Sequence, residues 1–271
     1  ETENLTVIYN PSNTTDNKNV TWTSSNNNVA SINNGVVTAK GIGNAVITAK
    51  VGSLTASYKI TVIKHDNPVI VKANTLTYNG KEQELITASN IKGNICYSYN
   101  PISSCSTNES IPKKINAGEY TVYYYVSGDN NYNSKSGSIK VNINKKSGSI
   151  SYLNKSITKI QGDQAFTNVL TKTGDGIINY SSSDNKVATI DKNGKVTILS
   201  SGNTVIKAIV IDGENYFYNI KEASYTLTVN KKIINIPIIS ISLNKTSGTK
   251  YIGETENLTV IYNPSNTTDN K

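Results

Sequence analysis

The residue types that carry most protein chemistry are scarce in this chain. Its 271 residues include two cysteines, one histidine and one tryptophan. The cysteines, Cys96 and Cys105, lie close together in the run CYSYNPISSC. Asn100 and Pro101 between them favour a chain reversal, which can bring the two sulfur atoms together. We predict a disulfide, which would stabilise so short a loop by roughly 2–3 kcal/mol and fits an oxidising, extracellular compartment. The alternative is two free thiols in a hairpin.

Catalytic and metal-binding arrangements lack the residues that they need. Triad catalysis requires a histidine beside a nucleophile in a cleft, but His65 lies at the expected junction of two domains. Two cysteines and one histidine are too few for a zinc site. Acidic side chains mostly fall in turns rich in Asn, Gly and Ser, where they cap backbone groups: Asp16, Asp129, Asp184 and Asp191. We predict no enzyme, no catalytic residue, no metal site and no cofactor.

Tyrosines are concentrated in the run Tyr120–Tyr125. Strand alternation puts Tyr120 and Tyr124 on one face, expected to point inward, and Tyr123 and Tyr125 together on the other. An exposed tyrosine pair can stack on a glycan, and cross-strand packing on a solvated sheet explains it equally. Trp22 is expected to be a core residue between two sheets.

Charge and hydropathy exclude two classes of partner. The net charge is +8, but the lysines are scattered, which favours solubility and predicts no nucleic-acid partner. No apolar run approaches the roughly 20 residues of a membrane-spanning helix. The chain has no methionine and no signal peptide, so we expect an internal fragment whose secretion signal and any anchor lie elsewhere.

An exact repeat is the strongest signal in the sequence. Residues 1–18 read ETENLTVIYNPSNTTDNK, and residues 254–271 read the same. The difference of the two starts, 254 − 1, gives a period of 253 residues. Identity over that length indicates one full period of a longer array. We therefore expect neighbouring repeats of the same protein as partners.

A weaker repeat lies within the period. Residues 22–38 read WTSSNNNVASINNGVVT, and residues 180–197 read YSSSDNKVATIDKNGKVT. Both combine short β-branched runs with Asn and Gly turns, which is typical of strands. In the run Ala45–Val51 alternate positions are apolar, as a half-buried strand requires. The sequence predicts an all-β protein with two paralogous domains.

At this point the residues resemble a known family. Asn10-Pro11-Ser12, Val20–Ser25, Val29–Ile32, Gly35–Ala39 and Gly43–Ala49 match the pattern of bacterial Ig-like domains of group 2. The opening strand of that pattern lies at Ile241–Gly253, so the first domain lacks it. Residues 148–230 resemble a divergent member. The run Asn116–Tyr124 is similar to MBG repeats of bacterial surface proteins.

The resemblance implies a domain order and a role. We expect a group 2 domain without its first strand at residues 1–63, an MBG-like domain at 64–146, a divergent group 2 domain at 147–231, and the opening strands of the next repeat at 232–271. Short linkers are expected around residues 63–67, 144–147 and 230–237. These would be tandem immunoglobulin-like β-sandwiches in an extended rod. The implied role is a non-enzymatic stalk of an adhesin-type protein at the bacterial cell surface, secreted or wall-anchored.

Two other functions fit the same features. The repeats can themselves bind host glycan or a cell-wall polymer and gain avidity by number, with Tyr123 and Tyr125 as ligand-facing aromatics. Alternatively, the chain is a filament or phage subunit that assembles head to tail. In that case Ile241, Leu243 and Tyr251 would lie in a segment that completes a neighbouring domain by strand complementation.

Overall fold

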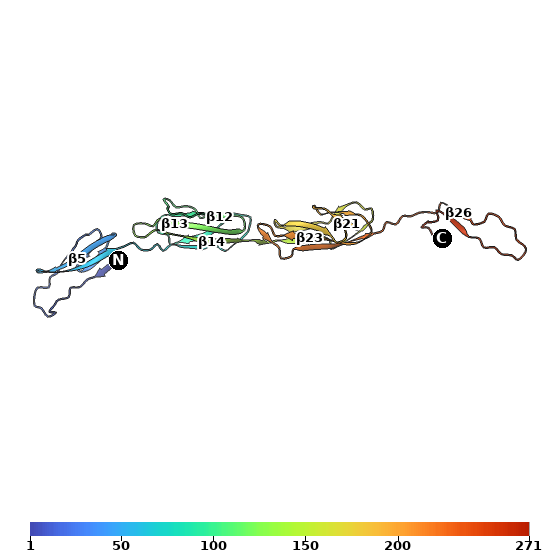
Figure 1. Cartoon of the computed structure of the whole chain (residues 1–271). Helices are drawn as coiled ribbons and strands as arrows, with labels where there is room; N and C mark the ends of the chain where they lie inside the picture. Colours follow the sequence, from blue (N-terminus) through green and yellow to red (C-terminus); the bar gives the residue numbers. More distant parts are fainter. Residues whose placement is uncertain (271) are drawn as a thin grey trace. The chain divides into compact units, whose positions relative to one another are not determined.

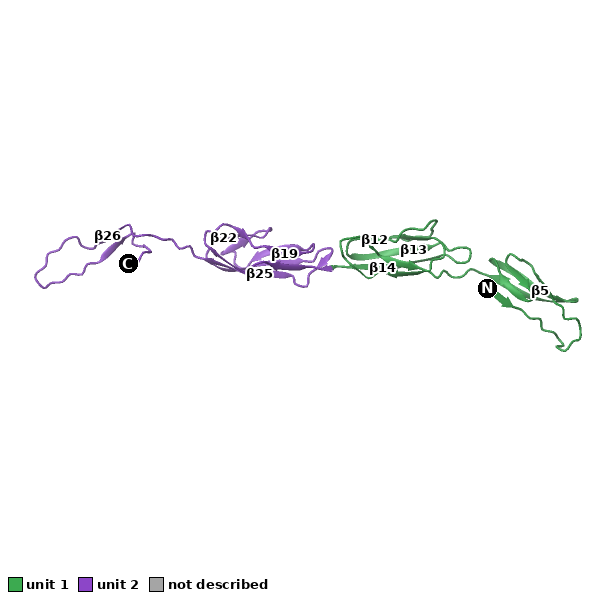
Figure 2. Ribbon diagram, turned by 180° about the vertical axis from the view of Figure 1, so that it is seen from behind, with its two compact units in different colours: residues 1–145 green, residues 146–271 purple. Residues whose placement is uncertain are grey.

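All regular structure in the described part of the chain is β-strand. The structure is a computed structural model that describes residues 1–270, and it divides into two compact units, residues 1–145 and residues from 146 onward (Figure 2). None of the described residues forms a helix, so none offers a helix that could cross a membrane. The prediction of an all-β protein of tandem immunoglobulin-like sandwiches is confirmed.

The first sandwich comprises residues 1–62. Its strands are β1 (Thr2–Asn4), β2 (Thr21–Ser24), β3 (Ala30–Asn33), β4 (Val36–Ala39), β5 (Gly43–Val51) and β6 (Leu54–Val62). They form two sheets, ordered β1-β4-β3 and β2-β5-β6. Ala45, Ile47 and Ala49 of β5 are buried, as their alternation predicts. Trp22 packs against the same core.

The middle sandwich comprises residues 63–145. Its strands are β7 (Ile70–Ala73), β8 (Leu76–Thr77), β9 (Gln83–Glu84), β10 (Ile86–Ser89), β11 (Ile95–Ser98), β12 (Lys113–Lys114), β13 (Gly118–Val126) and β14 (Lys135–Asn144). The main sheet has the order β11-β13-β14-β8, and the pairs β10-β7 and β12-β9 complete the sandwich. Two small cores lie between these layers, one around Val122 and Val141 and one around Val126.

The third sandwich comprises residues 146–230. Its strands are β15 (Lys146–Ser147), β16 (Ser149–Tyr152), β17 (Ser156–Ile160), β18 (Phe166–Thr167), β19 (Leu170–Thr173), β20 (Ile177–Ser182), β21 (Ala188–Ile190), β22 (Lys195–Ile198), β23 (Gly202–Ile211), β24 (Tyr216–Phe217) and β25 (Glu222–Asn230). One sheet has the order β17-β25-β23-β20 and another β18-β22-β21, with the pairs β16-β19 and β15-β24 beside them. Ile206, Ala208 and Leu227 have no exposed surface in its core.

A hairpin follows the third sandwich. Strand β26 (Ser240–Leu243; Figure 1) pairs antiparallel with β27 (Val260–Asn263). In this register Ile241 lies opposite Tyr262. Within residues 1–270, neither strand pairs with a further strand. Large apolar side chains of this hairpin are consequently exposed, Ile241 by 64% and Leu243 by 46%.

The expected linker around residues 63–67 is shorter in the structure. His65 bridges Tyr132 within the middle sandwich, and its backbone N–H donates to the carbonyl oxygen of Asn131 at 2.9 Å. Asn67 is only 2% exposed, and its amide donates to the carbonyl oxygen of Lys92 at 2.7 Å. Because a buried amide needs such partners, Asn67 belongs to the packed part of the middle sandwich, and His65 is joined to it by backbone pairing.

Candidate functional site

Strand β13 is the tyrosine-rich strand at the centre of the main sheet in the middle sandwich. It pairs antiparallel with β11 on one side and β14 on the other. Val122 and Val126 are fully buried, and Tyr120 and Tyr124 pack against the two cores. The inward face is therefore the one that strand alternation predicts.

Tyr123 and Tyr125 lie on the outer face of this sheet. Tyr123 has Ser98 and Ser138 as its cross-strand neighbours. Serine side chains are small, so the ring of Tyr123 is not walled in by bulky neighbours. Both tyrosines are nevertheless half-buried, because they lie on a central strand with partners on either side. Two positions along one strand separate the rings by about 6.6 Å.

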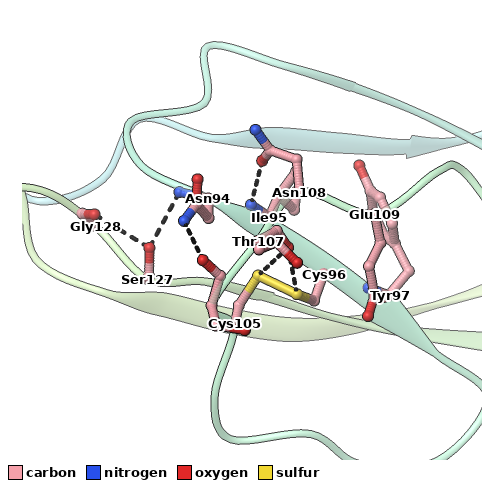
Figure 3. Close-up of a disulfide and its surroundings, with 11 residues drawn as sticks. Asn94, Ile95, Cys96, Tyr97, Cys105, Thr107, Asn108, Glu109, Ser127 and Gly128 are labelled. Carbon is pink, nitrogen blue, oxygen red and sulfur yellow. Dashed lines mark hydrogen bonds between the residues drawn. A yellow bond between two sulfur atoms is a disulfide. The ribbon is translucent and has the colours of Figure 1, made fainter.

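The disulfide lies at the edge of the same outer face. Cys96 and Cys105 are bonded, with Cα atoms 5.5 Å apart (Figure 3). In the register of β11 and β13, Cys96 lies opposite Tyr125. Cys96 is only 7% exposed although it points away from the core clusters. The looped chain that ends at Cys105 therefore lies beside the tyrosine pair.

Residues 106–109, which we call the edge strap, run along the outer edge of β11. The side-chain oxygens of Asn108 and Glu109 accept hydrogen bonds from the backbone N–H groups of Ile95 at 2.8 Å and Tyr97 at 3.0 Å (Figure 3). The Glu109 N–H donates to the Ile95 carbonyl oxygen at 3.0 Å. Unpaired edge groups invite pairing with another strand, so the strap protects this edge. The sequence did not predict the edge strap, because an irregular segment has no regular alternation of apolar and polar residues.

A hollow of about 690 Å³ opens next to the far end of β11. Its lining combines aromatic, polar and charged side chains: Glu82, Tyr97, Tyr99, Asn100, Ile111 and Lys113. The Lys114 ammonium lies 4.2 Å from the ring centroid of Tyr99, a cation–π distance. Burial raises the pKa of the Tyr97 and Tyr99 hydroxyls above the ordinary tyrosine range, and the Tyr99 hydroxyl donates to the Lys113 carbonyl oxygen at 3.1 Å. Sequence reasoning did not single out this hollow.

The chemistry that these features support is binding. Among residues 1–270, no group of three or more His, Cys, Asp or Glu side chains could hold a metal ion. His65 stacks near Tyr132, with ring centroids 5.6 Å apart. The cysteines are joined and supply no thiolate. Aromatic rings and hydroxyls on the middle sandwich are what a ligand would meet.

Comparison with known families matches two parts of the chain. Residues 1–62 match the family described as bacterial Ig-like domain (group 2). The chain carries a bacterial Ig-like domain. Residues 166–211, which include strands β18 to β23, match the immunoglobulin-like domain of intimin. The MBG-like assignment of residues 64–146 stays a prediction.

One relative and two solved structures are similar to parts of this chain. Intimin of Escherichia coli O157:H7 is 35% identical over 79 residues, which are 29% of this chain and 8% of intimin. This chain therefore spans less than a tenth of that relative. Among solved structures, domains 1–6 of the surface-layer protein SbsC align over 83% of this chain and 36% of theirs, at 14% identity and a TM-score of 0.31. The C-terminal 282-residue fragment of intimin, solved with the intimin-binding domain of its translocated receptor, aligns over 74% and 60%, at 17% identity and a TM-score of 0.26.

Proposed function

We propose that this chain is a force-transmitting spacer, one segment of the stalk of an adhesin-type protein on the bacterial surface. Its bacterial Ig-like domains are of the adhesin type, which supports an extracellular, cell-surface location. The spacer has no catalytic role. It holds an adhesive part of the protein at a distance from the cell and resists unfolding when that part is pulled.

The observation that carries this proposal is the pairing in the third sandwich of β17, which follows β15 and β16 near its start, with the last strand, β25. Strand β17 pairs in parallel with β25 over five residue pairs, from Ser156–Thr226 to Ile160–Asn230. The ladder extends at both ends. Thr226 N–H donates to the carbonyl oxygen of Lys155 at 3.1 Å, and Gln161 N–H donates to that of Asn230 at 2.8 Å.

Parallel pairing of these two strands determines how a pulling force acts. Once β15 and β16 have detached, force enters at the N-terminal end of β17 and leaves at the C-terminal end of β25, so it slides these two strands past each other. All hydrogen bonds of the ladder then share the load, whereas peeling would break them one at a time. Each contributes about 0.5–1.5 kcal/mol net. The middle sandwich repeats the design, since β8 pairs in parallel with the end of β14.

We also propose the division into domains at residues 1–63, 64–146, 147–231 and 232–271. Separate clusters of buried side chains support it, because those of residues 1–62, 63–145 and 146–230 share no member. A spacer built from separate cores can lose one sandwich under load while the others stay folded.

Single-molecule force spectroscopy tests the spacer function. We expect separate unfolding events, with residues 146–230 releasing up to about 30 nm of chain. Replacing Gln161 by Pro removes the N–H that donates to Asn230 and should lower the unfolding force of this event. The matched control, Gln161→Ala, keeps the N–H and should unfold at the original force. Equal forces for both variants and the unaltered chain would contradict the shear arrangement.

A second candidate function is weak binding of host glycan or cell-wall polymer by the outer face of β13. The pair Tyr123 and Tyr125 favours it, because Tyr123 lies between Ser98 and Ser138, while Tyr125 lies between Cys96 and Ser136. Avidity across repeats would raise the affinity. A partner on a host cell or another surface suits an adhesin-type protein.

A glycan array separates the two functions. A spacer shows no saturable binding. If the tyrosine face is the ligand site, Tyr123→Ala/Tyr125→Ala should weaken binding about ten-fold or more, because each ring contributes roughly 0.5–1.5 kcal/mol. The control Tyr123→Phe/Tyr125→Phe keeps both rings and should retain most of the binding. Binding that is unaffected by the alanine pair would place the ligand elsewhere.

A further inference from the structure

Strand β20 is an edge strand of the third sandwich. It pairs with β23 on one side, and among residues 1–270 no strand pairs with its other side. In an antiparallel ladder each residue turns its N–H and C=O groups toward the same neighbour, and successive residues alternate between the two sides. The Ser183 N–H donates to the Val205 carbonyl oxygen at 2.9 Å, so the odd-numbered residues of β20 face β23. The backbone groups of Ile178, Tyr180 and Ser182 consequently face the open edge.

The open edge of β20 is limited to these three residues, because the next position on either side already has partners. The Gly176 N–H donates to the Tyr218 hydroxyl at 3.1 Å, and the Gly176 carbonyl oxygen accepts from the Lys172 ammonium at 2.6 Å. At the other end, the Asp184 N–H donates to the Thr204 hydroxyl oxygen at 2.9 Å. The Asp184 carbonyl oxygen accepts from two backbone N–H groups of the turn that follows, at 3.2 Å. The free positions therefore form a short edge that is closed at both ends.

In the middle sandwich the equivalent edge is covered. Strand β11 has the place of β20 in a sheet of the same order, and the edge strap bonds the backbone N–H groups of Ile95 and Tyr97 that face outward (Figure 3). The strap can form because a long connection, residues 99–112, separates β11 from the next strand. The connection from β20 to β21, residues 183–187, is too short to fold back along the edge. Within residues 1–270, the third sandwich therefore supplies no cover for this edge.

The sequence of β20 lacks the features that usually prevent edge pairing. The strand reads IINYSS, with no proline and no charged residue, whereas natural edge strands often carry one of these. Strand β17, at the opposite edge of the same sheet, contains Lys159. A two-fold contact between copies places identical strands against each other, so charges of one sign on the strand would lie near their equivalents and repel. The uncharged strand β20 is therefore compatible with a second β20.

We propose that β20 pairs antiparallel with β20 of a second copy of this chain, about a two-fold axis at Tyr180. Ile178 would lie opposite Ser182 of the second copy, and Tyr180 opposite its own equivalent. Each of the three residue pairs exchanges two hydrogen bonds, so every free backbone group on both edges gains a partner. An edge closed at both ends needs a partner with the same short run of free positions, and β20 is itself such a strand. The pairing does not depend on the spacer function.

Register-specific cross-linking of whole chains tests the proposal. Asn179 would lie opposite Ser181 of the second copy in a non-hydrogen-bonded pair, with Cα atoms about 4.5 Å apart, within reach of a disulfide. A mixture of Asn179→Cys chains and Ser181→Cys chains should therefore give mixed dimers, about ten times more than either variant gives alone. In each variant alone the two cysteines are offset by two residues, about 6.6 Å along the strand. The control Asn203→Cys, exposed on β23 away from the edge, should give few mixed dimers with Ser181→Cys.

Sedimentation of charge variants gives a second readout. The mean mass of the unaltered chain should rise above that of the monomer with concentration. In Asn179→Lys/Ser181→Lys like charges would lie opposite each other on both sides of the two-fold axis, so the mean mass should fall back to that of the monomer. The matched variant Asn179→Lys/Ser181→Glu places opposite charges in the same positions and should associate again. Both side chains are exposed, so these changes leave the core intact.

Three results would overturn the proposal. The first is a mixture of Asn179→Cys and Ser181→Cys that cross-links no more than the Asn203→Cys control. The second is an association that the two lysines do not weaken, since the contact would then lie on another surface. The third is a mean mass that does not change with concentration, in which case a strand from another protein, and not a second copy, is the partner that fits the edge. None of these results bears on the force measurement, which concerns single chains.

Discussion

Between pH 10 and 12 the third sandwich should lose several kcal/mol of stability. Two of its core residues, Tyr152 and Tyr225, are 4% and 2% exposed, and their rings meet edge to face with centroids 4.8 Å apart. Burial raises the pKa of Tyr225 to about 12, and burial together with the charges that Tyr225 and Tyr180 would carry raises the pKa of Tyr152 further. The neutral phenols therefore fit the folded state, and the phenolates do not.

The direction of the pH effect follows from these shifts. In the unfolded chain both tyrosines ionise near pH 10. In the folded state they stay protonated until a higher pH, so the unfolded state releases protons first. The contribution of these two protonated tyrosines to the free energy of unfolding is fully present below pH 10. It is lost as the pH rises through 12. Tyr225 alone accounts for about 2.7 kcal/mol over this window, since each pKa unit is worth about 1.36 kcal/mol.

Urea unfolding of the third sandwich at pH 8, 10, 11 and 12 measures this loss. The double variant Tyr152→Phe/Tyr225→Phe should lose much less free energy of unfolding above pH 10 than the unaltered chain. At pH 8 the same change should be neutral or stabilising, because neither hydroxyl has a hydrogen-bond partner among residues 1–270. The control is Tyr218→Phe, which removes the acceptor that Gly176 N–H uses at 3.1 Å. It should destabilise at pH 8 by about 1–3 kcal/mol. A steep alkaline decline in the double variant would refute the assignment.

Face assignments could be predicted from the sequence because they depend on local periodicity. Alternation along Ala45–Val51 predicted which side chains of β5 are buried, and the same reasoning separated Tyr124 from Tyr125. Element limits were less accurate. The alternating run Ala45–Val51 lies in a strand that begins earlier, at Gly43, because pairing with β6 starts before the apolar alternation does. Periodicity shows which side is buried and does not show where pairing stops.

Contacts in space between residues that are far apart in the sequence could not be predicted from periodicity. The parallel pairing of β17 with β25 joins residues about 70 positions apart, and nothing in either run specifies the other. The edge strap depends on Asn108 and Glu109, whose side chains accept hydrogen bonds from the N–H groups of Ile95 and Tyr97. In the sequence these two residues look like those of any polar loop. Tyr152 meets Tyr225 only through the fold. The repeat is a further example: residues 1–18 and 254–271 have the same sequence, but the first copy forms β1 and the second forms β27 at a different position of the repeat, because their available partners differ.

Replacing both cysteines, Cys96→Ser/Cys105→Ser, should lower the melting temperature of the middle sandwich by about 10 °C or more. The bridge closes a loop with a sequence separation of 9 residues, and removing so short a cross-link costs roughly 2–3 kcal/mol. For a domain of this size each kcal/mol corresponds to about 4–8 °C. The double change avoids an unpaired thiol, which a single change would leave free to form intermolecular bridges.

The structure predicts which part of the middle sandwich loosens first when the disulfide is removed, namely the edge strap. Cys105 immediately precedes the edge strap, and Asn94 also holds it, by donating from its side chain to the Ser106 carbonyl oxygen at 2.7 Å. Without the bridge the strap is tethered only by hydrogen bonds, so the N–H groups of Ile95 and Tyr97 should exchange with solvent faster, while those of β14 keep their protection. Reductant should reproduce the melting shift in the unaltered chain and have no effect on the serine variant. An unchanged melting temperature after reduction, with unchanged exchange at Ile95 and Tyr97, would mean that the strap is held by its hydrogen bonds alone.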